Sequence, residues 1–360
     1  MRNFLVIFLK NFFKDKNILL TGHTGFKGSW LSEILINWGA DLTGYSLEPP
    51  TNPSLFNLLN LDSKMNSFIG DIRDLNYLSE VFNETNPEIV IHMAAQPIVR
   101  VSYDNPVMTY ETNVMGTVNI CECIRNSNSV KSFLNVTTDK VYENNERTEG
   151  YKEDEKLDGY DPYSNSKSCS ELVTHSYYNS FFKELEISCS TARAGNVIGG
   201  GDFAKDRIIP DCVRACLNEE DILIRNPYSI RPYQHVLEPL NIYLTIVKMQ
   251  FEDIGYSDCY NVGPNDEDCV ETRELVNLFC KYCNENKLSN ELKCISNSDN
   301  GPHEATFLKL DNEKIKETFG WEPKWNIETA IEKTVEWTKE YKNGNDVTEC
   351  VDNQIDEFFN

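Results

Sequence analysis

A glycine-rich turn directly after the first predicted strand constrains this chain more than any other feature. The apolar run at 17–21 predicts a buried strand, and it leads straight into Gly22, Gly25 and Gly28. Apolar residues at helical spacing over 27–38 predict that a helix follows. A GxxGxxG turn between a strand and a helix lets the backbone approach a pyrophosphate at the helix N-terminus. The start of the chain therefore predicts a dinucleotide-binding βα unit rather than a tight turn without a ligand.

Strand and helix patterns continue to alternate along the chain. Apolar runs predict further strands at 41–46, 65–69, 88–93, 132–138 and 187–192. Helical periodicity predicts helices at 75–82, 106–125, 162–182, 271–287 and 326–342. Such alternation is typical of parallel strands joined by crossover helices that cover both faces of a sheet. We therefore expect an α/β fold, a Rossmann-type doubly wound parallel sheet with a smaller, irregular C-terminal lobe.

The same patterns divide the chain into parts. Residues 14–190 are expected to form the dinucleotide-binding domain, and a segment at about 232–262 is expected to return to it. Residues 191–345, in which turns become frequent and periodicity weakens, are expected to form the substrate lobe. Residues 1–13 and 346–360 are expected to be terminal extensions.

The charge of the chain argues against two classes of partner. Its 34 Lys and Arg residues against 57 Asp and Glu residues give a formal net charge of −23. Nucleic acids and anionic membrane surfaces are bound by concentrated positive charge. We therefore expect no nucleic-acid partner and no membrane partner. No apolar stretch reaches the ~18 residues that a transmembrane helix needs.

The 12 cysteines are scattered and predict no disulfide framework. Cys280 and Cys283 have the CxxC spacing of redox and zinc sites, but no second pair and no nearby histidine pair completes a metal site. We therefore expect no bound metal, and reduced thiols in a cytoplasmic protein.

The end of the second predicted strand bears on which dinucleotide binds. A dinucleotide site usually has an acidic residue there for the ribose hydroxyls, whereas this strand ends at Ser46, whose hydroxyl can bond to the ribose only weakly. No Lys or Arg occurs from 29 to 62, so the strand offers no partner for a 2′-phosphate. Lys27 and His23, inside the turn, remain as partners for such a phosphate. The pattern favours NAD over NADP.

A tyrosine and a lysine four residues apart begin the helix predicted at 162–182. Tyr163 and Lys167 form a YxxxK motif and share one helical face. A nearby ammonium stabilises a phenolate, so Tyr163 can act as a base near neutral pH. An exposed ion pair would have the same spacing. The position of the motif after a strand that ends in Thr138 favours catalysis, because such folds place chemistry at the carboxyl ends of their strands.

Together these motifs resemble the extended short-chain dehydrogenases/reductases and, more narrowly, the CDP-glucose 4,6-dehydratase family. The resemblance covers roughly 14–340 and rests on specific segments. These are GHTGFKGSWL at 22–31, HMAAQ at 92–96, TTDKVYEN at 137–144, GYDPYSNSKSCSELVT at 159–174, ARAGNVIGGGD at 192–202, IRPYQHVLEPL at 230–240 and PHEATFLKLD at 302–311.

The resemblance implies a redox-neutral lyase that converts CDP-D-glucose to CDP-4-keto-6-deoxy-D-glucose and water. C4 of the sugar is oxidised, water leaves across C5–C6, and the hydride returns to C6. Thr138 would bond to the 4-hydroxyl, Tyr163 would take its proton, and Lys167 would hold the cofactor ribose. Sister enzymes acting on dTDP-glucose carry Asp-Glu after this threonine, where this chain has Asp139-Lys140. Asp139 would protonate the departing hydroxyl, and whether Lys140 removes the C5 proton is left open.

The resemblance also implies two sets of binding residues, each of which could instead serve only the structure. The cofactor set consists of Gly22, Thr24, Gly25, Phe26, Lys27, Gly28, Ser46, Asp71, Ile72, Ala94, Ala95, Gln96, Asn113, Tyr163 and Lys167. The nucleotide-sugar set consists of Thr138, Asn196, Arg207, Arg231 and His235. Family members pair through helices, here at 105–125 and 162–182, which implies a homodimer or homotetramer.

Two other functions are weighed against the dehydratase. A sugar-nucleotide epimerase of the same fold needs no machinery for water loss, and Asp139-Lys140 argues against it. A dinucleotide-sensing regulator would keep the fold and lose the chemistry, whereas Thr138, Tyr163 and Lys167 are all present. No single residue identifies the reader of the base, so cytosine rests on the resemblance alone.

Overall fold

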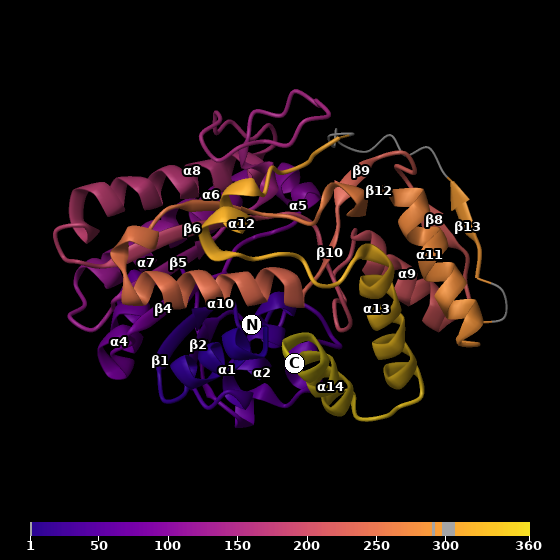
Figure 1. Cartoon of the computed structure of the whole chain (residues 1–360), viewed down its shortest axis with the longest axis horizontal. Helices are drawn as coiled ribbons and strands as arrows, with labels where there is room; N and C mark the ends of the chain where they lie inside the picture. The colour runs from indigo at the N-terminus through magenta and orange to yellow at the C-terminus, as the bar shows by residue number, and fades with distance from the viewer. Residues whose placement is uncertain (1, 290–291, 297–306) are drawn as a thin grey trace.

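The structure is a computed structural model that describes residues 2–289, 292–296 and 307–360 (Figure 1). The start of the resembling segment 302–311, namely 302–306, lies outside the described residues. The rest of the resembling segments lie within them.

Seven parallel strands form the central sheet, in the order β11-β6-β5-β4-β1-β2-β3. The strands are β1 (Asn17–Thr21), β2 (Asp41–Ser46), β3 (Asn66–Ile69), β4 (Ile89–His92), β5 (Ser132–Val136), β6 (Ser188–Ala194) and β11 (Cys259–Val262). The predicted doubly wound parallel sheet is thereby confirmed. All six predicted strands are present within two residues of their expected bounds. The order reverses at β1, so a crevice opens at the carboxyl ends of the strands on either side of it.

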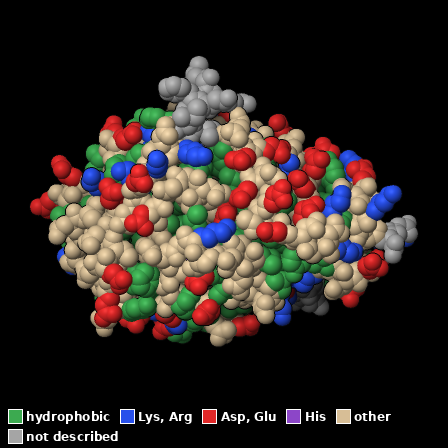
Figure 2. All heavy atoms as spheres, turned by 90° about the horizontal axis from the view of Figure 1, so that it is seen from below, with side chains coloured by type: hydrophobic (Ala, Val, Ile, Leu, Met, Phe, Trp, Pro, Cys, Tyr) green, Lys and Arg blue, Asp and Glu red, His purple; other side chains and the backbone are tan. Residues whose placement is uncertain are grey.

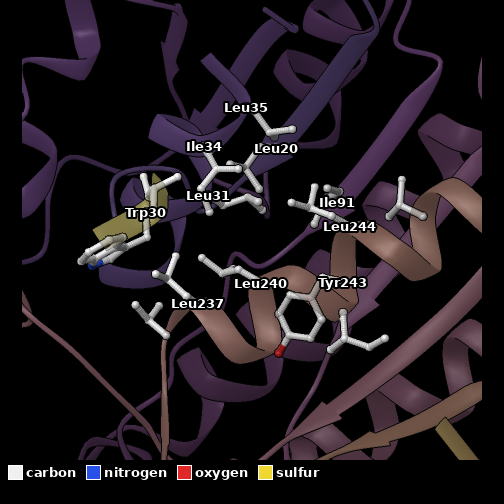
Figure 3. Close-up of a cluster of buried hydrophobic side chains, with 14 of the residues drawn as sticks. Leu20, Trp30, Leu31, Ile34, Leu35, Ile91, Leu237, Leu240, Tyr243 and Leu244 are labelled. Carbon is white, nitrogen blue, oxygen red and sulfur yellow. The ribbon is translucent and has the colours of Figure 1, made fainter. Parts of the chain in front are cut away.

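Helices cover both faces of this sheet. Successive residues of β1 show why its sequence is continuously apolar, because Leu19 packs in one hydrophobic cluster and Leu20 in the opposite one. One face carries α2 (Phe26–Asn37) and α10 (Leu237–Glu252), whose apolar side chains interlock in Figure 3. The other face carries α4 (Leu75–Thr85), α7 (Gly116–Arg125) and α8 (Pro162–Tyr177).

Two of the predicted long helices contain a wider π turn. The helix expected at 106–125 consists of α6 (Pro106–Tyr110), a π turn (Glu111–Met115) and α7. The helix expected at 162–182 ends in a second π turn (Tyr178–Phe182). The first π turn contains Asn113, one of the predicted site residues. Single π turns inside α-helices are frequent at functional sites.

A third hydrophobic cluster holds a smaller lobe beside the sheet. It gathers α9 (Ile208–Asn218), β8 (Ile222–Ile224), α11 (Thr272–Glu285) and α13 (Ile327–Lys342). The chain between them returns to the sheet through α10 and β11. Smaller elements complete the described part: α3 (Leu55–Leu58), α5 (Val99–Asp104), β7 (Val197–Ile198), β9 (Ile230–Pro232), β10 (Gln234–His235), β12 (Cys269–Glu271), β13 (Cys294–Ser296), α12 (Glu313–Phe319) and the 3₁₀ turns Leu61–Ser63, Asp139–Val141, Ile254–Tyr256 and Asp266–Asp268.

The two ends of the chain are helical and contribute to the core. In α1 (Arg2–Phe13), Phe13 is fully buried, and in α14 (Val347–Phe359), Phe359 packs edge-on against Trp38 at 4.9 Å between ring centroids. Both termini lie beneath the same face of the sheet (Figure 1). The segments expected as terminal extensions therefore form part of the packed structure.

The described residues offer few alternative sites. Within them no helix has the length and apolar character to cross a bilayer, and no group of three or more His, Cys, Asp or Glu side chains is arranged to hold a metal. All 12 cysteines are free. Acidic side chains are spread over the face shown in Figure 2, with Lys and Arg between them.

A buried ion pair joins α8 to the sheet beside the site. Glu171 of α8 accepts hydrogen bonds from Thr137, just after β5, and from Thr191 of β6, the latter at 2.7 Å. Arg193 of β6 pairs with Glu171 at 2.9 Å and donates to the hydroxyl of Tyr142 at 2.7 Å. Both charged side chains are almost fully buried. The pair thus holds α8 against the end of β5 and against β6.

Removal of one partner of this pair should be costly. We expect Arg193→Met to lower the free energy of unfolding by about 3–5 kcal/mol, because Glu171 is then left buried without its cation. Urea unfolding measures this change. The double variant Arg193→Met/Glu171→Gln should lose clearly less than the sum of the two single variants. Additive losses would mean that the two side chains are not coupled.

Candidate active site

A cavity of about 710 Å³ lies where the carboxyl edge of the sheet meets the smaller lobe. This volume lies within the range of small-molecule sites. The predicted residues on its wall are Phe26, Lys27, Thr138, Lys140, Tyr163, Asn196, Arg207 and Arg231. The sheet, α2, α8 and the lobe each supply part of this wall. Segments far apart in the sequence therefore meet at one site, as the parallel topology predicts.

The glycine turn packs against the end of β4 so closely that side chains do not fit. Gly22 has a φ of +80°, and a Cβ there would lie 2.8 Å from the backbone nitrogen of Ala94. A Cβ on Gly28 would lie 2.1 Å from the carbonyl oxygen of Gly22. Thr21 Oγ1 accepts a hydrogen bond from the backbone N–H of Ala94 at 3.1 Å, which holds the two segments together. Because no side chain stands in the way, a ligand can reach the backbone N–H groups at the N-terminus of α2. We call this turn, from Gly22 to Gly28, the cradle, and its shape fits a dinucleotide pyrophosphate.

The outer rim of the cradle is built from short polar contacts. The hydroxyls of Thr24 and Ser46 lie 2.9 Å apart, so Ser46 stands at the end of β2 where a ribose hydroxyl would be met. The Arg73 guanidinium hydrogen-bonds to Asp71 and lowers the pKa of that carboxyl. Ile72 is buried beside it. The structure therefore brings the predicted rim residues to one side of the turn.

Asn113 ties the loop after β4 to α8. Its Oδ1 accepts from the backbone N–H of Gln96 at 2.8 Å, and its Nδ2 donates to the Gln96 carbonyl at 3.0 Å and to Ser166 Oγ at 2.9 Å. The Gln96 side chain donates to Thr109 Oγ1 at 3.0 Å. Asn113 and Gln96 are both buried. Their contacts place Ala94 and Ala95 along the cradle and set the distance between cradle and α8.

Thr138, Asp139 and Lys140 follow β5 as one connected unit. The strand ends at Val136, so Thr138 lies two residues beyond it and caps a 3₁₀ turn. Thr138 Oγ1 donates to Asp139 Oδ1 at 2.9 Å, and Lys140 Nζ lies 3.5 Å from the same oxygen. Asp139 is fully buried behind the wall, and its Oδ2 has no hydrogen-bond partner in the described part of the chain. One carboxylate oxygen therefore remains available for a proton.

Tyr163 and Lys167 lie in the first two turns of α8. Asp161 caps this helix by accepting from the backbone N–H of Ser164 at 3.0 Å, and Pro162 occupies its first turn. Burial raises the pKa of Tyr163, while the charge of Lys140 and a hydrogen bond with Thr138 oppose that rise. The sequence argument expected a lowered pKa through Lys167, and the structure corrects it, because burial is the larger effect.

The Lys167 ammonium points toward the sheet. Its Nζ donates to the backbone carbonyl of Val136 at 3.1 Å. Burial lowers the pKa of Lys167 to about 8, and the charge of Glu171 opposes that change. Lys167 therefore lies behind the cavity wall, beside the end of β5, rather than on the wall itself.

The two histidines weighed as ligand contacts lie in the core instead. His235 is fully buried between Trp30 and Trp325, at 5.8 and 4.8 Å between ring centroids, and burial lowers its pKa to about 3. His23 is fully buried against Phe56, and burial lowers its pKa to about 4. Their surroundings suit packing by neutral rings rather than contact with a phosphate.

The lobe contributes the remaining polar wall. Arg207 pairs with Asp202 at 3.2 Å, and the backbone carbonyl of Asn196 accepts from Gln234 at 3.0 Å. The sequence argument missed Arg100 and Arg225, which also line the cavity. Arg100 follows the HMAAQ segment by only four residues, so proximity to a known motif could have indicated it. No motif lies close to Arg225 in the sequence, and the lobe lacks the regular spacing of apolar residues that would place this residue on an element.

Comparison with known proteins agrees with this architecture. The family model described as GDP-mannose 4,6 dehydratase matches residues 19–334. A CDP-glucose 4,6-dehydratase of Salmonella typhimurium is 45% identical over 97% of this chain and 98% of its own length. Two solved structures share the fold at 22% identity. One is a dTDP-glucose 4,6-dehydratase of Bacillus anthracis in complex with NAD, with a TM-score of 0.73 over 92% of this chain and 98% of that one. The other is a UDP-glucose 4-epimerase of Thermotoga maritima, with a TM-score of 0.76 over 90% of this chain and 99% of that one.

The family model covers most of the chain, and the Salmonella relative aligns over nearly the full length of both proteins. The chain therefore belongs to the GDP-mannose 4,6 dehydratase family within the extended short-chain dehydrogenases/reductases.

Proposed function

We propose that this chain is an NAD-dependent lyase that converts CDP-D-glucose to CDP-4-keto-6-deoxy-D-glucose and water. The observation that carries the proposal is that Thr138 and Lys140 line one cavity with Tyr163 beside the glycine cradle, while Asp139 contacts both from behind the wall. The choice of the cytidine nucleotide follows the relative that is 45% identical. The site thus combines a dinucleotide cradle with groups for proton transfer at three positions of a sugar.

The proposed division of labour separates the sheet from the smaller lobe. Residues 14–190, with 232–262, hold the dinucleotide, and residues 191–345 hold the nucleotide sugar. Bound NAD supplies a reversible hydride acceptor at the carboxyl edge of the sheet. Asn196, Arg207 and Arg231 face the cavity from the lobe and suit the diphosphate of the sugar nucleotide.

Oxidation at C4 requires removal of the 4-hydroxyl proton. We assign this proton to Tyr163, with Thr138 as the hydrogen-bond partner that orients the hydroxyl. Lys140 and Arg207 lower the pKa of the buried phenol, and together they offset part of the cost of its burial. These charges favour the phenolate, while burial keeps the pKa of Tyr163 above its ordinary value.

Water loss across C5–C6 requires an acid and a base. Asp139 supplies the proton to the departing C6 hydroxyl, because its Oδ2 has no partner in the described structure and Thr138 beside it reaches the cavity. Lys140 lies on the wall with its side chain partly exposed, 3.5 Å from Asp139 Oδ1. Transfer of its proton to Asp139 leaves a carboxyl that can protonate the departing hydroxyl and a neutral amine that accepts the C5 proton, which the neighbouring C4 ketone makes acidic. This pair distinguishes the dehydratase from an epimerase, which needs no group to expel water.

An exposed apolar surface favours pairing of two copies of the chain. Val107 and Met115 are 70% and 50% exposed, and Leu172 of α8 beside them is 55% exposed. Val107 and Met115, with Tyr110, Val114 and Cys169, border a shallow apolar groove. We assign this surface to a homodimer, which agrees with the helices at 105–125 and 162–182, and place the protein in the cytoplasm, where its 12 free thiols stay reduced.

The activity is tested with labelled sugar nucleotides. CDP-glucose carrying deuterium at C4 should lose one water, and mass spectrometry should locate the deuterium at C6 of the product, with solvent hydrogen at C5. UDP-, dTDP- and GDP-glucose serve as matched controls and should be turned over more slowly. Loss of the label to solvent, or product that requires stoichiometric added NAD, would contradict an internal redox cycle.

Tyr163→Phe should nearly abolish turnover. We expect a loss of ~10²–10⁴-fold in kcat, because the variant lacks the phenol that accepts the C4 hydroxyl proton. Binding of CDP, measured by calorimetry, should stay unchanged. In the wild-type enzyme the oxidation rate should rise with pH, because burial raises the pKa of Tyr163 and the phenolate is the active form. A variant with near wild-type rate would remove Tyr163 from the mechanism.

Lys140→Met should separate oxidation from elimination. With stoichiometric enzyme, absorbance of reduced cofactor should appear and persist, because C4 is oxidised while the C5 proton has no acceptor. Single-turnover spectroscopy measures this accumulation. Normal dehydration would make Lys140 a bystander, and a failure to reduce the cofactor would place it in the first step.

The oligomeric state is measured by light scattering. We expect a mass of twice the 41.4 kDa chain. Val107→Glu/Met115→Glu should shift the protein toward the monomer, because it places charges in the proposed interface. Ile254→Glu, at an apolar side chain that is 41% exposed on another surface, is the matched control. A monomeric wild-type protein would overturn the assignment.

A further inference from the structure

One lysine inside the cavity has no anionic partner and no role in the mechanism above. Lys27 is the second residue of α2, and its side chain lines the cavity. Its Nζ lies 5.7 Å from the ring centroid of Tyr243. No hydrogen bond or ion pair of this ammonium occurs in the described ranges 2–289, 292–296 and 307–360. A cation placed this way needs an anion from outside the chain.

The groups around Lys27 sharpen this requirement. Lys167 of α8 and Arg207 before α9 are cations that repel it, and Asp139 after β5 is the one opposing anion among the groups that influence it. Burial, followed by the two cations, lowers the pKa of Lys27 to about 7. On α10, the fully buried hydroxyl of Tyr243 has no partner within the described structure, and in Figure 3 it points away from the labelled leucines. Around Lys27 itself two cations therefore act against one anion, whereas the acidic side chains of the cavity wall lie on the side of the lobe and of the 146–161 segment.

We propose that Lys27 is the proton-coupled anchor for a diphosphate, either that of the dinucleotide or that of the nucleotide sugar, and that it takes up one proton when this diphosphate binds. The proposal rests on the proposed function, since it assumes that both ligands enter this cavity. A diphosphate is the chemistry that fits, because the glycine turn exposes backbone N–H groups at the start of the same helix and Arg207 faces the same space.

The direction of the side chain excludes the role that the sequence left open for it. A 2′-phosphate would lie at the end of β2, where Ser46 and Thr24 meet. Lys27 instead extends to the cavity wall, within electrostatic reach of Asp139 and Lys167 at the carboxyl end of β5. Its charge therefore lies toward the cavity in which the reaction is proposed to occur, and away from the position of the adenosine ribose.

Binding of an anion should raise the pKa of Lys27, so the linkage has a definite sign. Below pH ~7 the free protein already carries the proton, and binding takes up little. Above that value binding must draw a proton from solvent, and the apparent Kd should weaken by up to tenfold per pH unit until the pKa of the bound form is reached. CDP is fully ionised above pH 7.5, because phosphate monoesters have a second pKa near 6.

Calorimetry at pH 8 in buffers of different ionisation enthalpy counts the protons taken up. NAD is titrated into cofactor-free protein, and CDP is titrated into protein saturated with NAD. If proton uptake occurs in the NAD titration and is lost in Lys27→Met, then Lys27 binds the diphosphate of the dinucleotide. If it occurs in the CDP titration and is lost in that variant, then Lys27 binds the diphosphate of the nucleotide sugar. Lys27→Met should also weaken that ligand roughly 10- to 100-fold at pH 7. Lys27→Arg should keep most of the affinity without the proton uptake, because its charge is permanent.

Lys205→Met is the matched control, since it removes the same charge from an exposed position of the lobe, two residues before Arg207. It should change neither affinity nor proton uptake. Equal uptake and equal affinity in wild type and Lys27→Met, for both ligands, would overturn the proposal. If neither ligand bound the wild-type protein, the proposed function itself would fail. The proton count in wild type against Lys27→Arg decides the question even if Lys27→Met does not fold.

Discussion

The shared direction of seven parallel strands is the constraint on which the rest of this structure depends. Because all strands end at one edge, the glycine turn after β1, the loop after β4 and the Thr138 segment after β5 lie side by side. The contact between Gly22 and Ala94 is possible only without a Cβ, and it sets the depth of the cradle. The carboxyl edge of the sheet therefore determines where the residues of the site lie.

Charge is the second constraint, because a chain of net charge −23 must hold an anionic ligand. The cavity wall is less acidic than the chain as a whole, because six of its side chains are Lys or Arg and five are Asp or Glu. Lys27, Lys140 and Arg207 line the cavity and repel one another. The buried anions Asp139 and Glu171 behind the wall offset part of this repulsion. The negative charge of a bound diphosphate would then neutralise the cations that face it.

Periodicity predicted the fold well, because strands buried on both faces and amphipathic helices leave simple patterns. It missed the π turn at Asn113, since one extra residue in a helical turn barely changes the spacing of apolar side chains. The residues of the site were found by motif, yet their orientations were not. His235 sits in a motif and is buried among tryptophans, whereas Lys27 turns into the cavity. Such outcomes depend on distant packing partners that no local pattern contains.

The proton inventory of the proposed reaction explains why the site needs several weakly held protons. Oxidation releases the 4-hydroxyl proton to Tyr163, and elimination releases a second proton from C5. The departing hydroxyl takes up one proton and C5 takes up another when the hydride returns to C6, so the overall reaction consumes none. A buried site can run this cycle only if its donors and acceptors differ little in affinity for a proton. Burial lowers the pKa of Lys167 to about 8, but it raises that of Tyr163, so two groups that ordinarily titrate close together move apart. The same low-dielectric wall that makes each charge costly therefore opposes the phenolate, and the neighbouring cations Lys140 and Arg207 act against that effect.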